Sequence, residues 1–214
     1  VGVHAKGRVA DGKLGYNAEL VYQLGEKTMV ARDAGGNITG STDMDIAAYG
    51  LVAGADYRIG ESFQLKAEGT YASGDDDPGD DTISTFNPLF PFGHAYQGHL
   101  DLFTWRNNHD LAFHVQAKPA EDWWIGIAAH FFWLDTTDDA WYGLNNRPTR
   151  FDPTVNDEYL GWELDISAKH WITLLGTLAL RYTESARVGS LALTRSPSSS
   201  EHSSLSRSEE HTSE

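Results

Sequence analysis

The sequence contains no cysteine, which excludes a disulfide framework, a thiolate metal site and a cysteine nucleophile. It is also poor in basic residues, with 16 Lys and Arg against 31 Asp and Glu and a formal net charge of −15. A chain this acidic does not neutralise phosphates, so we expect no nucleic-acid partner. Long apolar runs are missing and the mean hydropathy is −0.42, which excludes a helical membrane span. The low hydropathy does not exclude a transmembrane β-barrel, because barrel strands alternate between apolar and polar residues.

Alternation of apolar and polar residues is the dominant pattern between residues 14 and 182. A period of two is typical of β-strands with one apolar face. No segment shows a convincing helical period, so we expect an all-β chain of about eight strands. The expected strands cover residues 1–9, 14–24, 49–59, 63–71, 111–117, 123–133, 162–168 and 172–183.

The connections between these strands alternate between short and long. Short ones are expected near Asp11–Gly12, Gly60–Glu61, 119–121 and His170–Trp171, and long polar ones over 26–44, 74–108 and 135–157. Successive antiparallel strands then place every long loop on one edge and every tight turn on the other. An up-and-down transmembrane β-barrel of the outer-membrane type has this arrangement.

Aromatic residues bracket the apolar faces of three strands. Tyr49 and Tyr57, Phe63 and Tyr71, and Trp123 and Trp133 lie eight to ten residues apart. At the usual rise and tilt of barrel strands this distance spans about 20–25 Å along the membrane normal. The alternative is a soluble secreted β-sandwich that binds or cleaves a glycan, because sandwich strands also alternate. Sandwich loops, however, do not sort by length to opposite edges, so the pattern favours the barrel.

The polar residues of the alternating strands would line an aqueous path through such a barrel. We expect this pore lining to consist of Glu19, Asp56, Arg58, Lys66, Glu68, Asp110, His114, Gln116, Lys118, Glu163, Asp165 and Lys169. One run in the second long loop is too apolar for a free loop, and we expect it to fold inward or pack on the rim as a constriction loop. This run consists of Phe86, Asn87, Pro88, Leu89, Phe90 and Pro91.

Several motifs resemble the alginate-export family of outer-membrane porins. The segment 71–81 leads into 85–98, from Ser73-Gly74-Asp75 to Phe90-Pro91-Phe92, and resembles the signature region of that family. Three further stretches are similar to it, and the resemblance covers residues 15–165; the stretches are 105–111, 132–142 and 161–165.

The resemblance implies the carboxy-terminal part of a barrel of about eighteen strands in the bacterial outer membrane. It also implies outer-membrane lipid and lipopolysaccharide as partners, and a polysaccharide or small polar solute as cargo that moves by diffusion. An alginate exporter would line its pore with Arg and Lys, whereas the lining expected here is balanced to slightly acidic. A general porin of the same family is therefore an alternative to an alginate exporter.

Metal and catalytic motifs are weak. The aspartates of one loop are a weak calcium candidate, because clustered carboxylates suit calcium, but their spacing does not match an EF-hand; they are Asp75, Asp76, Asp77, Asp80 and Asp81. The nine histidines lack the paired spacing of a zinc site. Glu163 and Asp165 share one face of a strand and could act as a glycosidase pair, but a polar pore face requires no catalysis. We therefore expect no enzyme and no cofactor.

The carboxy-terminal end of the chain differs from the middle in composition. Residues 185–214 contain no aromatic residue and are rich in serine, and so polar a segment does not repay the entropy of ordering. The last eight residues resemble the translation of a sequencing adaptor; a natural Ser-rich tail is the alternative. We expect residues 1–184 to be a barrel fragment that is incomplete at both ends, followed by a disordered tail.

Overall fold

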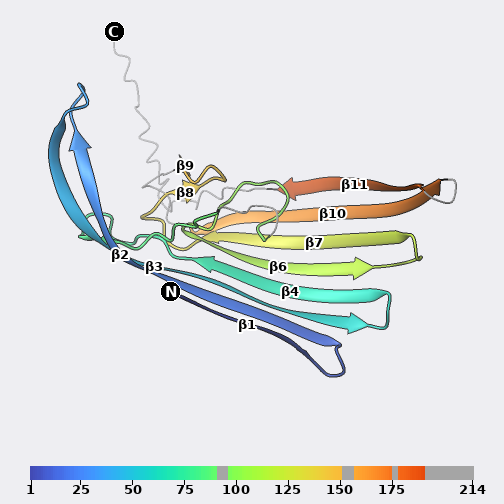
Figure 1. The fold of residues 1–214 in the computed structure, drawn as a ribbon. Helices are drawn as coiled ribbons and strands as arrows, with labels where there is room; N and C mark the ends of the chain where they lie inside the picture. Colours follow the sequence, from blue (N-terminus) through green and yellow to red (C-terminus); the bar gives the residue numbers. More distant parts are fainter. Residues whose placement is uncertain (91–95, 151–156, 175–177, 191–214) are drawn as a thin grey trace, which may run out of the picture.

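The computed structural model describes residues 1–90, 96–150, 157–174 and 178–190, and these form an all-β structure with long antiparallel strands (Figure 1). Eight strands form one meander, in the spatial order β1-β2-β3-β4-β6-β7-β10-β11. The meander strands are β1 (Gly2–Val9), β2 (Leu14–Arg32), β3 (Ile38–Ile59), β4 (Phe63–Ala72), β6 (Asn108–Ala117), β7 (Trp123–Leu134), β10 (Tyr159–Leu174) and β11 (Leu178–Ser190). The predicted all-β class and antiparallel pairing are confirmed.

The remaining strands belong to the long connections. The short β5 (Thr82–Ile83) pairs in parallel with β3, and β8 (Trp141–Tyr142) pairs with β9 (Pro148–Arg150) in a separate two-stranded sheet. The main sheet is open, with β1 and β11 at its two edges. A closed barrel and its size of about eighteen strands stay predictions.

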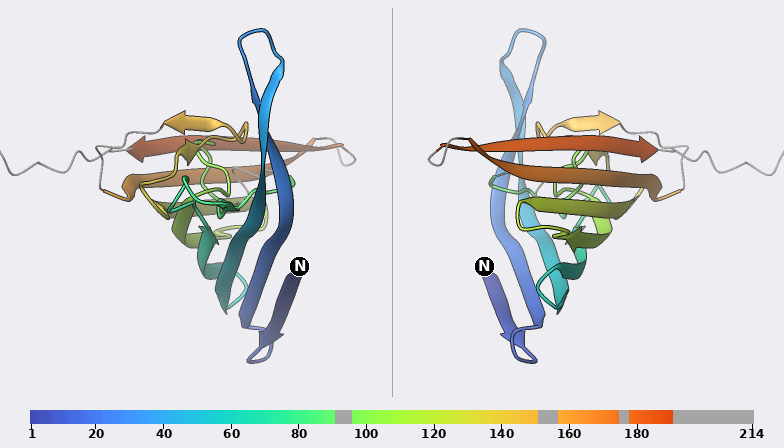
Figure 2. Two further views of the ribbon diagram at one scale, coloured as in Figure 1. Left: turned by 90° about the vertical axis from the view of Figure 1, so that its left-hand side faces the viewer. Right: turned by 90° about the vertical axis from the view of Figure 1, so that its right-hand side faces the viewer.

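The tight turns β1–β2, β3–β4 and β6–β7 lie at one edge of the sheet, and the long connections β4–β6 and β7–β10 lie at the other, as Figure 1 shows. The β1–β2 turn is tight because Ala10, Asp11 and Gly12 all adopt positive φ, at 53°, 53° and 79°. Figure 2 shows that the sheet is curved and that the long connections and β8–β9 lie on its concave side. Among the residues described, no helix has the length and apolarity needed to cross a membrane.

Two predicted connections are wrong. The loop expected over 26–44 is a hairpin, because β2 runs to Arg32 and β3 begins at Ile38. The Asp33 carboxylate closes the hairpin by accepting hydrogen bonds from the backbone N–H groups of Gly35 and Asn37, both at 2.9 Å. Both faces of this hairpin are exposed. Its sequence therefore needs no apolar face and shows no alternation of apolar and polar residues, which was the pattern used to predict strands. The turn expected at His170–Trp171 is also wrong, because both residues lie inside β10.

The end of the sheet lies close to the predicted domain boundary, which stays a prediction. β11 pairs with β10 as far as Ser190, opposite Trp162, so the paired backbone continues six residues past residue 184. Residues 191–214, which include most of the expected tail, lie outside the described residues.

Candidate functional site

The two faces of the main sheet differ sharply. One, the apolar face, carries exposed aromatic and aliphatic side chains on β2, β3, β4, β6, β7 and β10, among them Tyr16, Leu20, Tyr49, Leu51, Tyr57, Ile59, Phe63, Leu65, Leu111, Phe113, Val115, Trp123, Ile127, Trp162 and Ile166. In the described part of the chain the only other sheet is β8–β9. Its Trp141 packs with Phe103 and Phe132, which belong to the opposite, concave side. Because no described sheet covers the apolar face, the structure does not show the packing of a β-sandwich.

The other face, here called the polar face, brings the expected pore-lining residues together. The register places Asp56 beside Lys66 and Lys66 beside His114 on three neighbouring strands. Glu163 lies opposite His130, and Lys169 lies opposite Trp124. All twelve expected residues lie on this face or, for Lys118, directly after a strand that contributes to it. Whether they contact a water-filled lumen stays a prediction.

Strand β1 adds charged residues that the sequence analysis did not assign to this face. His4, Lys6 and Arg8 pair with Glu19, Asn17 and Gly15, and therefore lie on the polar face. The Arg8 guanidinium donates to both carboxylate oxygens of Asp56, at 2.8 and 2.9 Å. The alternation of β1, with polar residues at positions 4, 6 and 8, carried this signal.

In the half of the polar face nearest the long loops, residues 97–103, here called the infolded segment, cover β6, β7 and β10. Glu163, 1% exposed, accepts hydrogen bonds through one oxygen from the backbone N–H groups of His99 and Leu100, at 2.6 and 2.9 Å. Asp165 accepts from the His99 ring at 3.0 Å. Gly98 has φ of +77°, and a Cβ there would lie 2.5 Å from a Glu163 oxygen, so only glycine allows this close approach.

Aromatic packing holds the end of the infolded segment. Phe103, which is fully buried, stacks on Phe132 with ring centroids 4.3 Å apart and on Trp141 at 5.1 Å. The Trp141 indole N–H donates to the Leu102 carbonyl at 3.1 Å. Asn107 then connects two long loops, because its amide donates to the carbonyls of Thr136 and Ala140.

Deeper in the same half, the charged side chains pair with each other. The Asp110 carboxylate lies 2.8 Å from the His130 ring, and both side chains are buried. The Lys66 ammonium lies 3.0 Å from Glu68. His114 meets His130 edge to face, with ring centroids 5.5 Å apart. The five predicted acids Asp56, Glu68, Asp110, Glu163 and Asp165 are thus all engaged; among described residues, the sixth, Glu19, has no hydrogen-bond or ion-pair partner.

Two aspartates fix the long loops at the rim. Asp135 accepts from Gly74 N–H at 2.8 Å, from the Tyr71 hydroxyl at 2.5 Å and from the His109 ring at 3.1 Å. Burial raises the pKa of Asp135, but these hydrogen bonds outweigh it and hold the pKa below its ordinary value.

Asp139 accepts from the hydroxyls of Thr85 and Tyr142, at 2.5 and 2.7 Å. Burial and the Asp139 carboxylate together raise the pKa of Tyr142 to about 12. Tyr142 therefore stays protonated and continues to donate to Asp139 at neutral pH.

The expected constriction loop divides into two parts. Phe86 is buried against Ala48 and Ala72, and Asn87 exchanges hydrogen bonds with the Gln23 side chain at 2.7 and 2.9 Å. Leu89 and Phe90 are 86% and 78% exposed; Pro88 follows Asn87, and Pro91 lies outside the described residues. Phe86 and Asn87 thus lie on the polar face of β2–β4. Residues 97–103 cover this face on β6, β7 and β10, and sequence reasoning missed them. The apolar Leu102-Phe103 pair inside a polar loop was their signal.

The acidic loop forms ordinary turns. Asp77 and Asp80 accept hydrogen bonds from the backbone N–H groups of Gly79 and Thr82, while Asp76 and Asp81 are exposed. Burial raises the pKa of Asp75. Among the residues described, no three His, Asp or Glu side chains are grouped to hold a metal ion, so the structure adds no support for calcium here.

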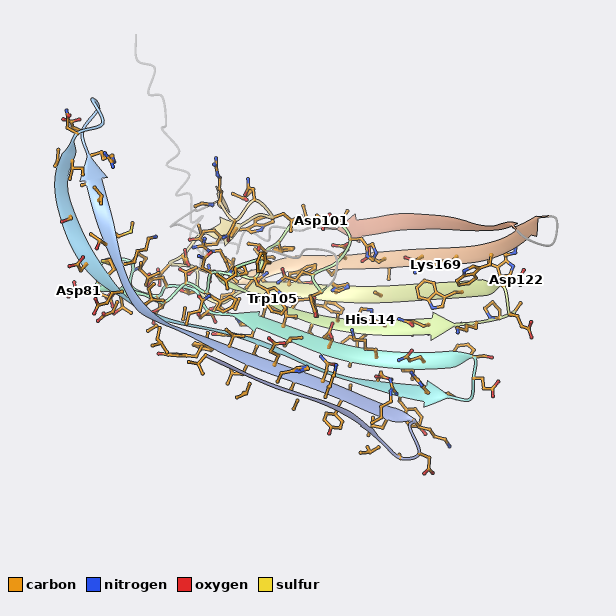
Figure 3. All side chains as sticks on the ribbon, in the orientation of Figure 1. Asp81, Asp101, Trp105, His114, Asp122 and Lys169 are labelled. Carbon is orange, nitrogen blue, oxygen red and sulfur yellow. The ribbon has the colours of Figure 1, made fainter. Side chains whose placement is uncertain are left out.

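The half of the polar face nearest the short turns is open. Figure 3 shows Lys169 and Asp122 toward this edge, Trp105 and Asp81 toward the long-loop edge, and His114 between them. A hollow of about 430 Å³ lies at this edge, and its lining includes Arg58, Gln64, Gln116, Lys118 and Trp124. Within the described ranges, the side chains of Arg58, Gln116 and Lys118 have no hydrogen-bond or ion-pair partner, in contrast to the acids of the other half.

A family model described as alginate export matches residues 1–191, a range that contains all the motifs whose resemblance was noted above. No curated protein matches the chain.

Proposed function

The chain belongs to the alginate-export family, and we propose on this premise that it forms part of the wall of an outer-membrane β-barrel channel. A polysaccharide or another polar solute would diffuse through this channel. The observation that carries the proposal is the exposed apolar face, which lies on the convex side of a curved sheet whose concave side is polar. In water such a face costs free energy, whereas in a bilayer it is solvated by lipid.

The ends of the apolar face support a membrane position. Near the long loops, Tyr49 and Tyr71 stack with centroids 5.2 Å apart. Near the short turns, Trp123 stacks on His170 at 4.4 Å, and the His170 ring lies 2.7 Å from Asp122. Aromatic rings with polar partners suit the two membrane–water interfaces.

Transport would follow from the shape and charge of the concave side. The infolded segment narrows the path in the long-loop half, so the widest described part of the path lies in the short-turn half. The acids on the polar face are mostly engaged, whereas Arg58 and Lys118 are not. The hollow of the short-turn half thus presents Arg58 and Lys118 without a described partner, which supports an anionic solute such as an alginate-like polysaccharide.

Single-channel recording of the full-length protein in planar lipid bilayers tests this function. We expect discrete current steps in salt solution with a preference for anions. A protein that folds and inserts but conducts no current would overturn the channel. Steps with strong cation preference would leave the channel in place and overturn the anionic solute.

A further inference from the structure

Two buried acids of β10, Glu163 and Asp165, meet at one backbone N–H group of the infolded segment, and they are here called the acid pair. The His99 N–H donates to both carboxylates, to Glu163 Oε1 at 2.6 Å and to Asp165 Oδ2 at 3.2 Å. Both acids lie on the polar face and both are buried. Because they share one donor in a place shielded from water, their charges would repel each other strongly if both were ionised.

The described donors reach only two of the four oxygens of the acid pair. Glu163 Oε1 also accepts from the Leu100 N–H at 2.9 Å. Asp165 Oδ2 lies 3.0 Å from the His99 ring. The other two oxygens, Glu163 Oε2 and Asp165 Oδ1, are buried and have no hydrogen-bond partner among the described residues. A buried charged oxygen without a donor costs free energy, so one further hydrogen between these oxygens would stabilise the pair.

On the β7 side of the acid pair, the histidines do not supply this hydrogen. His130 lies opposite Glu163, but its Nδ1 is 2.8 Å from an Asp110 oxygen. One strand further, on β6, His114 lies in the same row as Asp165. Its Nε2 is buried without a hydrogen-bond partner in the described chain. Neither ring therefore donates a described hydrogen bond to the acid pair.

The infolded segment and β11 form the other surroundings of the acid pair. The infolded segment contributes the His99 ring, which contacts Asp165, and the acidic Asp101. On β11, the register places Arg187 opposite Asp165 and a glycine opposite Glu163. On the β11 side, therefore, no basic residue lies opposite Glu163.

We propose that the acid pair holds one proton, and that this proton keeps the infolded segment closed over β10. A proton on Glu163 Oε2 donates to Asp165 Oδ1, so that one hydrogen bond satisfies both unpartnered oxygens. The proton also removes one of two adjacent negative charges. Glu163 Oε1 meanwhile continues to accept from the N–H groups of His99 and Leu100.

The direction of the pH dependence follows from where the proton is bound. When the infolded segment is open, both carboxylates contact water, and solvated carboxylates are ionised above about pH 4. The closed state therefore binds one proton more than the open state at neutral pH, so it is favoured at low pH and loses this advantage as the pH rises. On release the proton passes to water, and repulsion between the two carboxylates separates the segment from β10.

The inference rests on the proposed function, because the infolded segment sets the width of the channel, but the proton is measured without conduction. Infrared spectra of the full-length protein in detergent are recorded while the pH is raised. We expect the carbonyl band of a protonated carboxylic acid to be present at neutral pH, to disappear in alkali, and to be missing from Glu163→Gln. Glu19→Gln, on the same face, should keep the band. If the parent and Glu163→Gln have the same band, basic residues such as Arg187 balance both charges and the proposal is overturned.

Amide hydrogen exchange in the same preparation measures whether the proton holds the segment. After correction for the intrinsic effect of pH, protection of the His99 and Leu100 amides is expected to fall about tenfold between mild acid and alkali. Glu163→Gln should stay protected at both, because its amide oxygen still accepts from the segment and its N–H group donates to Asp165. Asp165→Asn gives the same test if Glu163→Gln does not fold. An equal fall in the parent and the variant would overturn the proposal.

Single-channel recording separates this inference from the proposed function. The conductance of the parent is expected to rise about twofold from mild acid to alkali as the segment opens, whereas Glu163→Gln keeps the lower value throughout. A channel whose conductance is the same at both pH values overturns the proton-held segment alone. A folded protein that shows the infrared band and the loss of protection but never conducts overturns the channel alone.

Discussion

The two halves of the polar face differ in which charged side chains have partners within the protein. In the long-loop half, Glu163 and Asp165 are buried and bind the infolded segment, and Asp110 binds His130. In the short-turn half, Arg58 and Lys118 line an open hollow, and their side chains form no hydrogen bond or ion pair with a described residue. Buried carboxylates of the long-loop half therefore serve the protein's own structure, while two cations of the short-turn half, Arg58 and Lys118, are left for solvent or solute. Counting charges by residue type hides this difference.

The largest expected effect concerns the aromatic packing that only the long-loop half has. Phe103→Ala removes a fully buried ring from between Phe132 and Trp141, and we expect it to lower the free energy of unfolding by about 3–5 kcal/mol. Phe90→Ala, in an exposed part of the same loop, is the control and should change it by less than about 0.5 kcal/mol. Urea unfolding in detergent measures both. Similar values for the two variants would contradict the packing described.

The next effect concerns the carboxylate that binds the infolded segment. Glu163→Ala leaves the N–H groups of His99 and Leu100 without their acceptor, which we expect to cost about 2–3 kcal/mol. Amide hydrogen exchange at residues 97–103 should become faster, and single-channel conductance should rise. Glu19→Ala, on the same face but without a partner, is expected to change neither quantity. Unchanged exchange in Glu163→Ala would show that the segment is held elsewhere.

Ion selectivity sharpens the comparison between free and engaged charges. Arg58→Glu reverses a free charge in the open half, and we expect the cation-to-anion permeability ratio to rise about twofold. Asp165→Asn removes a charge that is 3% exposed and bound by His99, so its effect on the ratio should be smaller. Reversal potentials in a salt gradient measure both ratios. A larger shift in Asp165→Asn than in Arg58→Glu would reverse the roles of the two halves.

The smallest effect is a pH dependence at the rim. Because the folded pKa of Asp135 is held below its ordinary value of 3.8, its contribution to stability is present above 3.8 and is lost as the pH falls through the folded value. Asp135→Asn should therefore lower the free energy of unfolding by about 1 kcal/mol at neutral pH, and the difference from the parent should shrink as the pH falls below 3.8. The exposed Asp138→Asn is the control. A difference that grows in acid would contradict the assigned partners.

Local patterns in the sequence were enough to predict the two faces of the sheet. Alternation placed Lys66 and Glu68 on one face and Leu65 and Ala67 on the other, because side chains in a strand alternate strictly. The β2–β3 hairpin was missed, since residues 26–44 are exposed on both faces and carry no alternation. The turn predicted at His170–Trp171 was also wrong, because β10 continues through these two residues to Leu174.

The engagement of the acids could not be predicted from local patterns. Glu163 is 64 residues from His99, which belongs to the infolded segment that it binds. The period of a strand does not indicate which distant loop the strand contacts. Asp110 and His130 meet across neighbouring strands, and their pairing depends on a register that short turns fix. The hollow could not be predicted for the same reason. Arg58, Gln116 and Trp124 come from three different strands, and only the strand register shows that they line one hollow.

In the proposed channel the polar face contacts water and the apolar face contacts lipid. The chain contains no cysteine, so a cysteine introduced into it can be labelled specifically in the full-length protein, in planar bilayers, once any cysteine outside this chain has been replaced. Gln116 and Val115 are neighbours on opposite faces of β6. A charged, membrane-impermeant thiol reagent should react with Gln116→Cys and reduce the single-channel current, and should leave Val115→Cys unmodified. Modification of Val115→Cys with Gln116→Cys protected would contradict the account.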